Sequence, residues 1–321
     1  MPKEVRLRVA VLMGGVSNER EVSLKSGRQV AVALTERGYD VHAVDVTAPN
    51  VDMLDALKPH AVFVALHGAF GEDGRVQAEL ERKGLPYVGS GPEASRKGMD
   101  KLASKRAFIM HGVPTPDYLV VDGPPDVARA VRGAERLGYP VVCKPVAGGS
   151  SIGVSLCRSA QELSDGIQGA LAADPAGAVL VERYQQGREL TVGVLDGEPL
   201  PLVEIRTGRA FFDYEAKYVD KGTSYLLDVA LPPAVYLRAQ EVGVGACRAL
   251  GCRHMARTDV IYGEDGCFYV LEVNTIPGCT SRSLLPMAAA AQGIEFAELC
   301  HRLVRMALRD AAQAGVRSAA A

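Results

Sequence analysis

The sequence has no long basic run, and its formal net charge is only −2 at pH 7. It therefore lacks the electrostatic footprint that would favour a nucleic-acid backbone or an anionic membrane. No apolar stretch approaches the roughly 18 residues of a membrane-spanning helix, and the first apolar run, residues 9–13, is too short for the core of a secretion signal. We therefore expect a cytoplasmic protein that acts on small molecules and binds neither nucleic acid nor membrane.

Other familiar signatures are also missing. The seven cysteines form no Cys-x-x-Cys pair, and several lie in apolar runs, so we expect reduced, buried thiols. They are Cys143, Cys157, Cys247, Cys252, Cys267, Cys279 and Cys300. The Gly14-Gly15 turn does not match the Gly-x-Gly-x-x-Gly pattern and predicts no dinucleotide site.

The chain does have the length and composition of a multidomain enzyme. Its 321 residues, 48% of them hydrophobic and 23% charged, suffice for two or three domains. Over residues 1–98, apolar runs alternate with amphipathic segments, which predicts a Rossmann-like parallel α/β domain. The expected strands are 9–13, 41–46, 61–66 and 85–88, and the main expected helices are 20–37 and 75–83.

Two further units are expected, which makes the whole chain a combination of α/β and α+β parts. Residues 99–186 predict helices and strands in mixed order: helices 100–111, 125–137 and 160–173, and strands 117–121, 140–145, 153–157 and 178–184. Residues 187–321 are rich in hairpins up to about residue 275. Two helices are expected there, at 234–250 and 295–313.

A hairpin in the third unit carries the most informative polar pattern. Two strand-like runs flank a Gly-Glu-Asp-Gly turn at 263–266. The simplest register forms three pairs: Tyr262 with Cys267, Asp259 with Val270, and Arg257 with Glu272. Period-2 alternation then places four polar side chains on one face: Arg257, Asp259, Glu272 and Asn274. The opposite, core face would hold Val260, Tyr262, Tyr269, Leu271 and Val273.

This polar face favours a metal site. Asp259, Glu272 and Asn274 supply hard oxygen ligands of the kind that Mg²⁺ prefers. Two carboxylates about 4 Å apart repel by about 4 kcal/mol at an effective dielectric of 20, so a cation is favoured between them. Taken alone, however, the pattern also fits a surface ion pair between Arg257 and Glu272.

A glycine-rich turn between two expected strands indicates an anion site. Residues 144–153 combine successive glycines with Lys144, Ser150 and Ser151, so backbone N–H groups could surround a phosphate while the lysine adds charge. A plain turn would need neither the lysine nor the paired serines. Lys101, at the start of the preceding helix, is a candidate for a second phosphate cation, although by itself it would be an ordinary surface lysine.

Further polar residues stand at strand ends. Glu182 ends a strand and is followed within seven residues by Glu189, and a carboxylate here suits a ribose. His67 follows the strand expected at 61–66, where ligand sites of α/β sheets occur. Taken singly, His67 fits a loop histidine, and Glu19 fits a first-turn glutamate favoured by the helix dipole.

Four motifs together make the chain resemble the ATP-grasp enzymes and, among them, the D-alanine–D-alanine ligases. They are residues 14–23, 67–74, 213–218 and 272–284. The resemblance covers nearly all of the chain. It implies an ATP-grasp fold, with a central subdomain at 99–186 and a C-terminal subdomain at 187–321. The stretch 206–228 is then expected to form a lid.

The resemblance also implies how ATP and metal are held. Two Mg²⁺ ions, with Mn²⁺ as a substitute, would be bound by Asp259, Glu272 and Asn274. The phosphates of ATP would be contacted by Lys101, Lys144, Ser151 and Lys217. The adenosine would be contacted by Glu182, Tyr184, Glu189 and Phe211.

In the same way, the resemblance implies a substrate site. Glu19 would meet the ammonium of a first D-alanine, with His67 nearby, and Ser150 and Tyr218 would join Glu19 in a hydrogen-bonded set. The oxyanion would be stabilised by Arg257 and the amide of Gly278. Ser283 would bind the carboxylate of the second substrate.

The implied reaction is ATP-dependent ligation of two D-alanine molecules through a D-alanyl phosphate, for peptidoglycan precursors, by an enzyme that is usually dimeric. Three alternatives remain: a ligase making D-alanyl-D-lactate, a nucleotide-binding regulator without turnover, and another ligase on the same scaffold. Tyr218 favours the dipeptide, because depsipeptide makers in the family carry phenylalanine or a different lid. The substrate residues Glu19 and Ser283 argue against a regulator.

Overall fold

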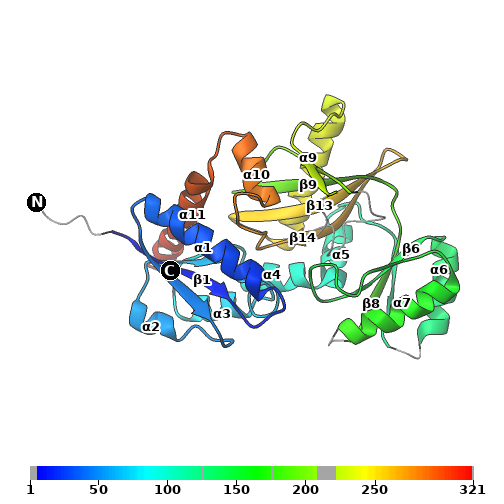
Figure 1. The fold of residues 1–321 in the computed structure, drawn as a ribbon, viewed down its shortest axis with the longest axis horizontal. Coiled ribbons are helices and arrows are strands. Elements are labelled where there is room, and N and C mark those ends of the chain that lie inside the picture. Colours follow the sequence, from blue (N-terminus) through cyan, green and yellow to red (C-terminus); the bar gives the residue numbers. More distant parts are fainter. Residues whose placement is uncertain (1–5, 124–125, 175–176, 208–221, 320–321) are drawn as a thin grey trace, which may run out of the picture.

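The computed structural model describes residues 6–123, 126–174, 177–207 and 222–319, and it contains three sheets (Figure 1). The first is a parallel sheet with strand order β2-β1-β3-β4. Its elements are β1 (Arg8–Gly14), α1 (Arg20–Glu36), β2 (Asp40–Val46), α2 (Met53–Leu57), β3 (Ala61–Val64), α3 (Arg75–Arg82) and β4 (Tyr87–Val88). The predicted Rossmann-like α/β character of the N-terminal residues is confirmed.

Two helices connect this sheet to the next, where the sequence predicted one. They are α4 (Pro92–Met99) and α5 (Lys101–Met110). Asp100 separates them because its backbone is extended and its side chain accepts a hydrogen bond from the Ala103 N–H at 2.9 Å, which caps α5. Pro92 begins α4, at the first helical position that proline favours. The helix was not predicted because its eight residues are too few to show a clear apolar periodicity in the sequence.

The second sheet is antiparallel, with strand order β5-β8-β6-β7. Its elements are β5 (Tyr118–Val121), α6 (Val127–Leu137), β6 (Val141–Pro145), β7 (Ser155–Cys157), α7 (Ala160–Ala173) and β8 (Val179–Arg183). Buried residues of α6 and α7 share one core with the sheet, among them Ala134, Ile167 and Val181. The glycine-rich turn predicted at 144–153 connects β6 to β7, so both ends of the turn are held by paired strands.

The third sheet is antiparallel and has the strand order β12-β11-β9-β13-β14, with β10 paired to β9. Its strands are β9 (Gly187–Leu195), β10 (Glu198–Pro199), β11 (Val203–Arg206), β12 (Ser224–Leu226), β13 (Met255–Gly263) and β14 (Phe268–Asn274). The accompanying helices are α9 (Pro233–Leu250), α10 (Leu284–Ala291) and α11 (Phe296–Ala319). The sequence missed α10, and α11 runs beyond the predicted end at 313.

The two ends of the chain meet in one hydrophobic core. Buried residues of β1 and α1, such as Val11 and Leu34, belong to the same cluster as Leu299 and Leu303 of α11 and Leu285 of α10. Figure 1 accordingly shows α11 next to α1. The three sheets fall within the three ranges expected from the sequence, and α11 returns to cover the first of them.

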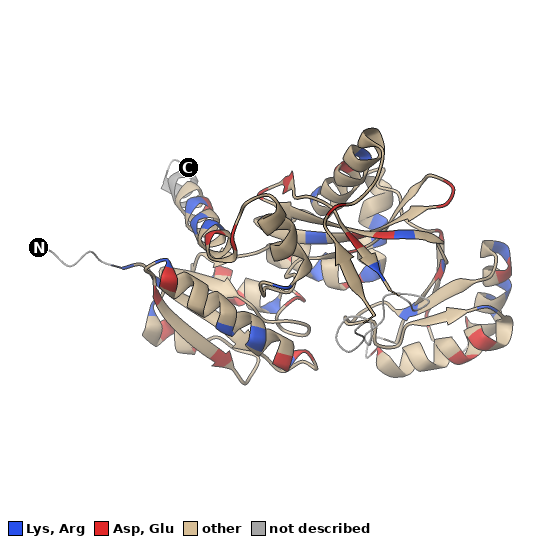
Figure 2. Cartoon of the chain, turned by 45° about the horizontal axis from the view of Figure 1, so that its top comes forward, with Lys and Arg blue, Asp and Glu red and all other residues tan. Residues whose placement is uncertain are grey.

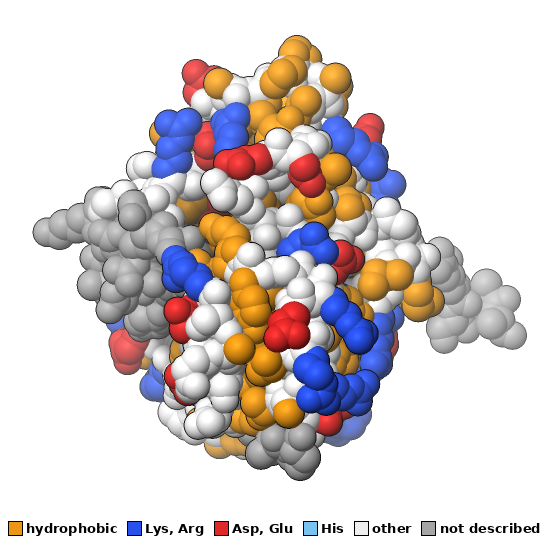
Figure 3. Space-filling model, turned by 90° about the vertical axis from the view of Figure 1, so that its right-hand side faces the viewer, with side chains coloured by type: hydrophobic (Ala, Val, Ile, Leu, Met, Phe, Trp, Pro, Cys, Tyr) orange, Lys and Arg blue, Asp and Glu red, His pale blue; other side chains and the backbone are white. Residues whose placement is uncertain are grey.

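Charged side chains of both signs are spread over the described elements. Lys and Arg are interspersed with Asp and Glu over the described elements (Figure 2). Seen from the side of α6 and α7, hydrophobic side chains form a narrow strip with charged side chains on both sides (Figure 3). Within the described ranges, none of the helices is both long enough and apolar enough to cross a membrane.

The cysteine prediction was only partly correct. All seven thiols are free and five are buried, but Cys252 is half-buried and Cys267 is exposed. Cys267 lies between the 263–266 turn and Phe268, the first residue of β14, which explains its exposure.

The turn between β1 and α1 requires glycine at position 14. Gly14 has φ +85°, and a Cβ there would lie 2.2 Å from Asp45 Oδ1 and 2.5 Å from Arg20 Nη1, two side chains joined by an ion pair. Gly14→Ala is expected to destabilise the protein by about 1–3 kcal/mol, since a left-handed alanine costs about 1–2 kcal/mol and displacing the exposed Arg20–Asp45 ion pair adds a smaller cost. Gly38→Ala is the matched control, because Gly38 has φ +84° and open space around it. Thermal unfolding of both variants checks this, and equal losses would contradict the steric argument.

Candidate active site

Two neighbouring cavities meet at the glycine-rich turn. The first, about 520 Å³, lies between this turn and the third sheet. The second, about 540 Å³, lies between the N-terminal unit, the start of α10 and the same sheet. Four residues line both cavities: Gly148, Gly149, Ser150 and Glu272. Among the described residues, the turn and this one carboxylate therefore form the border between the two cavities.

The hairpin of β13 and β14 differs in register from the prediction. The observed pairs are Arg257–Asn274, Asp259–Glu272, Val260–Val270 and Tyr262–Phe268. The register shifts between Asp259 and Val260, which leaves Leu271 as an extra residue on β14, a β-bulge. All three predicted pairs were therefore wrong: Tyr262 with Cys267, Asp259 with Val270, and Arg257 with Glu272.

The bulge also changes which side chains face the core. Phe268 and Val270 lie in the core beside Val260, whereas Leu271 lines the first cavity, so the predicted core positions Tyr269 and Leu271 were wrong. Beyond the bulge the polar face is as predicted. The shift places Asp259 directly opposite Glu272, where Cβ atoms are typically about 4.5–5.5 Å apart, rather than on a diagonal.

Asp259 is held from two sides. Arg257 Nε and Nη2 donate to its two carboxylate oxygens at 2.9 and 2.8 Å, a bidentate contact along the same strand. The Thr191 hydroxyl of β9 donates to Asp259 Oδ1 at 2.8 Å. Asp259 is only 6% exposed, so these contacts fix its carboxylate at the wall of the first cavity. Arg257 thus binds Asp259 through two hydrogen bonds, a contact that the simple pairing of Arg257 with Glu272 did not predict.

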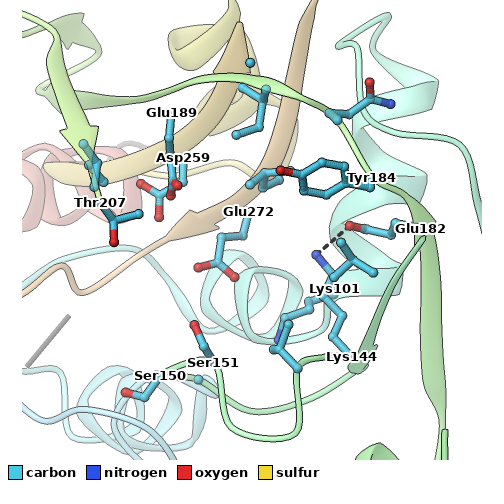
Figure 4. Close-up of a pocket in the computed structure, with 18 of the residues that line it drawn as sticks. Lys101, Lys144, Ser150, Ser151, Glu182, Tyr184, Glu189, Thr207, Asp259 and Glu272 are labelled. Carbon is cyan, nitrogen blue, oxygen red and sulfur yellow. Dashed lines mark ion pairs between the residues drawn. The ribbon is translucent and has the colours of Figure 1, made fainter. Parts of the chain in front are cut away.

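Two of the predicted metal ligands, Asp259 and Glu272, lie on this wall, and the third, Asn274, lines the second cavity. In Figure 4 the Glu272 side chain points into the cavity, with Asp259 and Glu189 on the strand side and Ser150 and Ser151 across from it. Asn274 Oδ1 accepts a hydrogen bond from the Ile276 N–H at 3.0 Å, which orients its amide. Among the described residues, no group of three or more His, Cys, Asp or Glu side chains is placed to hold a metal. Two carboxylates and an amide suit a Mg²⁺ that takes its remaining ligands from water or phosphate oxygens.

The glycine-rich turn has the backbone of an anion site. Ser150 and Ser151 both have positive φ, 53° and 57°, a conformation that non-glycine residues rarely adopt and that is concentrated at functional sites. Lys101 Nζ donates to the Gly148 carbonyl at 2.7 Å, so the lysine predicted as a phosphate cation lies against the turn. Lys101, Ser151 and Tyr184 all line the first cavity.

Behind the turn lies a buried cluster of charges that the sequence analysis missed in part. Lys144 Nζ is 2.7 Å from Glu182 Oε2, and Lys105 Nζ is 2.6 Å from Glu182 Oε1. Burial raises the pKa of Glu182, but the two ammonium groups outweigh it and the pKa is lowered. The burial of Lys105 could have been predicted from its position three residues before Phe108, which places it on the apolar face of α5.

A hydrogen-bonded set joins the turn to the N-terminal unit. The Ser150 hydroxyl donates to Glu19 Oε1, and the Ser17 hydroxyl donates to the His67 carbonyl at 2.7 Å. Glu19 and His67 follow β1 and β3, parallel neighbours whose carboxyl ends meet at one edge of the sheet. The structure thus brings together Glu19, Ser150 and His67, as the sequence predicted.

His67 is 5% exposed and lies beside Glu72, which sequence analysis did not single out. Its Nδ1 is 3.9 Å from Glu72 Oε1, and Glu72 Oε2 accepts from the Gly68 N–H at 2.6 Å. Burial lowers the pKa of His67, but the carboxylates of Glu72 and Glu19 outweigh that effect and the pKa is raised. A histidine that holds its proton more firmly is suited to facing an anion.

The far wall of the second cavity is the loop before α10. The Ser283 hydroxyl accepts from the Thr280 N–H at 3.1 Å, and a Cβ at Gly278 would lie 3.1 Å from Ser283 Oγ, so the loop is tightly folded. Helix α1 fastens the loop: the Cys279 N–H donates to Ser26 Oγ at 3.4 Å, and the Ser281 N–H donates to Gln29 Oε1 at 3.0 Å. The predicted residues Gly278 and Ser283 therefore face Glu19 and His67 across the cavity.

Some predicted residues cannot be placed. Phe211, Lys217 and Tyr218, with most of the predicted lid, lie outside the described residues. Tyr225 of β12, which follows this gap, lines the second cavity and was not predicted.

Comparisons with known proteins agree on one family. Residues 108–305 match the family model described as D-ala D-ala ligase C-terminus. The D-alanine–D-alanine ligase of Syntrophotalea carbinolica is 44% identical over 301 residues, which is 92% of this chain and 95% of that protein. The ligase of Gloeobacter violaceus is 44% identical over 306 residues, covering 94% of this chain and all of that protein (100%).

A solved structure of the same family has a similar fold. The D-alanine–D-alanine ligase of Bacillus anthracis, crystallised with ATP, superposes with a TM-score of 0.83 at 32% identity, covering 96% of this chain and 99% of that one. The predicted ATP-grasp fold is confirmed by this match. The chain belongs to the D-alanine–D-alanine ligase family, whose members are ATP-dependent, ADP-forming ligases of peptidoglycan precursor synthesis.

Proposed function

We propose that the two cavities hold the two halves of the family's reaction. ATP occupies the first, with its phosphates at the glycine-rich turn, and two D-alanine molecules occupy the second. The observation that carries this assignment is that, within the part of the chain that the structure describes, both cavities are lined by the turn and by Glu272, so the terminal phosphate and a substrate carboxylate would meet there. The ATP bound to the Bacillus anthracis relative supports a nucleotide site in this fold.

A carboxylate must be activated before an amine can attack it. An oxygen of the first D-alanine carboxylate attacks the γ-phosphorus, ADP leaves, and a D-alanyl phosphate forms. Both partners are anionic, so the site must supply positive charge and alignment. Lys101 and Lys144 provide cations on the nucleotide side, and the N–H groups of residues 148–151 face the phosphates.

Metal ions fit the border of the two cavities, where Asp259 lines the first, Asn274 lines the second and Glu272 lines both. Asp259, Glu272 and Asn274 would hold two Mg²⁺ ions, for which Mn²⁺ can substitute, with phosphate oxygens completing the ligand set. When bound, the metal neutralises phosphate charge and brings ATP and the carboxylate into line. Arg257 and Thr191 keep Asp259 in place for this role.

The first D-alanine is oriented by the N-terminal unit. Glu19, fixed by the Ser150 hydroxyl, pairs with its ammonium, and His67 lies beside it. The second D-alanine binds through its carboxylate at Ser283, where the N-terminus of α10 adds a favourable dipole. Its free amine then attacks the acyl carbon of the D-alanyl phosphate.

The attack creates a negatively charged oxygen that must be stabilised. Arg257 lines the second cavity. The Gly278 N–H belongs to the loop that is hydrogen-bonded to α1. Together they form an oxyanion site in a pocket closed by the turn. Collapse of the tetrahedral species breaks the bond to phosphate and leaves D-alanyl-D-alanine. Lys217 and Tyr218 would close the site from the lid, with Phe211 and Tyr184 against the adenine near Glu182 and Glu189.

We further propose that the protein works in the cytoplasm, where peptidoglycan precursors are made, and that it is a homodimer like most of its family. Each of the three units would have one role: the substrate domain is 1–98, the central subdomain is 99–186 and the C-terminal subdomain is 187–321. Analytical ultracentrifugation tests the dimer directly.

The first experiment is phosphate release by the purified protein with ATP and Mg²⁺. Separate reactions contain no amino acid, D-alanine, L-alanine, or D-alanine with D-lactate. Phosphate release and dipeptide formation with D-alanine alone are expected. Release driven mainly by D-lactate would assign the depsipeptide reaction, and ATP binding without turnover would assign a regulator.

Tyr218→Phe tests specificity. The hydroxyl of Tyr218 is proposed to join Glu19 and Ser150, and its loss is expected to raise the use of D-lactate relative to D-alanine as second substrate about tenfold, the value of one hydrogen bond of about 1.4 kcal/mol. Competition between the two substrates, resolved by mass spectrometry, gives the ratio. An unchanged ratio would remove Tyr218 from specificity.

A further inference from the structure

Lys105 is a charged side chain buried behind the first cavity, where it pairs with Glu182. It is 0% exposed, whereas Glu182 is 2% and Lys144 is 7% exposed. Its ammonium contacts the Glu182 carboxylate from α5, on the side away from Lys144. Glu182 and Lys144 line the first cavity, but Lys105 does not. Among the described residues, Lys105 can therefore influence a bound nucleotide through its neighbours and not by lining the cavity itself.

The remaining contacts of Lys105 extend to the strand of the metal wall. Lys105 Nζ donates to Thr115 Oγ1 at 2.6 Å, and Thr115 donates to the Val270 carbonyl at 2.8 Å. Val270 lies in β14, two residues before Glu272, and its N–H donates to the Pro114 carbonyl at 2.8 Å. One ammonium thus ties together α5, β8 and β14, three elements that form the base of the cavity.

The charge balance of this cluster is unusual. Two ammonium groups share one carboxylate, so the cluster carries a net charge of +1 when both are protonated. Placing an ammonium group in the protein interior is costly unless it is paired with a carboxylate. Here Lys105 shares the Glu182 carboxylate with Lys144. Without Lys105, the negative charge of Glu182 would cancel the positive charge of Lys144, which is the lysine proposed to face the phosphates.

We propose that Lys105 is a positioning residue for ATP: it binds one oxygen of Glu182 and thereby leaves Lys144 with positive charge for the phosphates. This inference rests on the proposed function, because it assumes that the first cavity binds ATP. Lys105 also fixes the Glu182 carboxylate at the end of β8, beside Tyr184 and the adenosine part of the cavity.

The protonation of Lys105 provides an independent readout. Burial, reinforced by the charge of Lys144 and opposed by Glu182, lowers its pKa to about 8. The groups that face it are Lys144 from β6, Glu182 from β8, and the ring of Tyr118 from β5, 5.6 Å from Nζ. Above this pH Lys105 becomes neutral, the cluster loses its net charge, and kcat/KM for ATP should fall.

The test compares Lys105→Met with the wild-type enzyme under saturating D-alanine. The variant is expected to raise the KM for ATP about tenfold, the equivalent of weakening one charge-assisted hydrogen bond, with kcat changed by less than about twofold. Arg106→Met is the control, because Arg106 is the exposed neighbour on the same helix and loses the same charge. The variant should also lose the fall of kcat/KM above about pH 8 that the wild-type enzyme shows.

A second pair of variants separates charge from packing. In a Glu182→Gln background, the carboxylate that Lys105 neutralises is gone, so adding Lys105→Met should change the KM for ATP less than it does in the wild type. An equal rise in both backgrounds, or an unchanged KM in Lys105→Met, would overturn the proposal. Should Lys105→Met fail to fold, a wild-type kcat/KM that stays flat between pH 7 and 9 would overturn it.

The two levels of inference fail differently. Absence of D-alanine-dependent phosphate release by the wild-type protein would overturn the proposed function. Normal release by the wild type, combined with an unaffected KM for ATP in Lys105→Met, would overturn only the role of Lys105. Calorimetric titration of wild type and variant with ADP gives the same comparison without turnover.

Discussion

Glu272→Gln is expected to reduce kcat by about two to three orders of magnitude, or about 3–4 kcal/mol of transition-state stabilisation. Glu272 is the carboxylate shared by both cavities, and it lies directly opposite Asp259. Glutamine preserves its size but removes the charge that would hold a metal ion between ATP and the substrate carboxylate. Steady-state phosphate release at saturating ATP and D-alanine measures the effect.

The fold should not suffer from this change. Removing one of two opposed carboxylates relieves repulsion in the absence of metal, so the melting temperature of the metal-free protein should be unchanged or higher. Glu264→Gln is the matched control, because Glu264 is an exposed glutamate in the turn of the same hairpin. Full activity in the Glu272 variant would remove the metal role from this residue. A second readout is Mn²⁺ binding followed by electron paramagnetic resonance, which should weaken in the Glu272 variant alone.

Arg257→Lys is expected to reduce kcat about 100-fold, although the charge is retained. The guanidinium forks onto Asp259 through Nε and Nη2, and the same group is proposed to meet the oxyanion. Lysine offers a point charge without the planar fork, so it cannot hold Asp259 and the oxyanion at the same time. Since the oxyanion appears only in the transition state, the KM for ATP should change little.

Arg309→Lys serves as the control for this substitution. Arg309 of α11 forks onto Asp196 with distances of 2.6 and 2.9 Å, and it lines neither cavity. The control removes the same kind of bidentate contact and should leave kcat unaffected. If both variants lose activity equally, the loss would report general damage from Arg→Lys replacement rather than a role of Arg257 in catalysis.

The site shows where sequence patterns are sufficient. The glycine-rich turn at 144–153 and the polar face of the hairpin were found from composition and alternation, and His67 was noted at the end of an expected strand. These features depend on neighbours close in sequence, and parallel strands bring their carboxyl ends to one edge without further information. The contact between Glu19 and Ser150 was suggested only by the resemblance to a family, since 131 positions separate them.

The hairpin register shows where such patterns fail. Alternation along each strand predicted the polar face, but it could not reveal that Leu271 bulges out of β14. A bulge is decided by how both strands pack on their neighbours, here β9 on one side and the core beneath α9 on the other. It is this bulge that turns a diagonal pair of carboxylates into a directly opposed one.

By itself, then, the sequence determined the class of fold, because fold class follows from local periodicity, and with the resemblance to a family it supplied the candidate site residues, whose roles stay predictions. Only the tertiary structure decided that two cavities meet at Glu272, that α1 fastens the loop of Gly278 and Ser283, and that α11 covers the first sheet. The tertiary structure alone also paired Lys105 with Glu182, 77 positions away along the chain (182 − 105). Contacts of this kind form because buried charges and polar groups must find partners wherever the packed core places them, and local sequence carries no record of that placement.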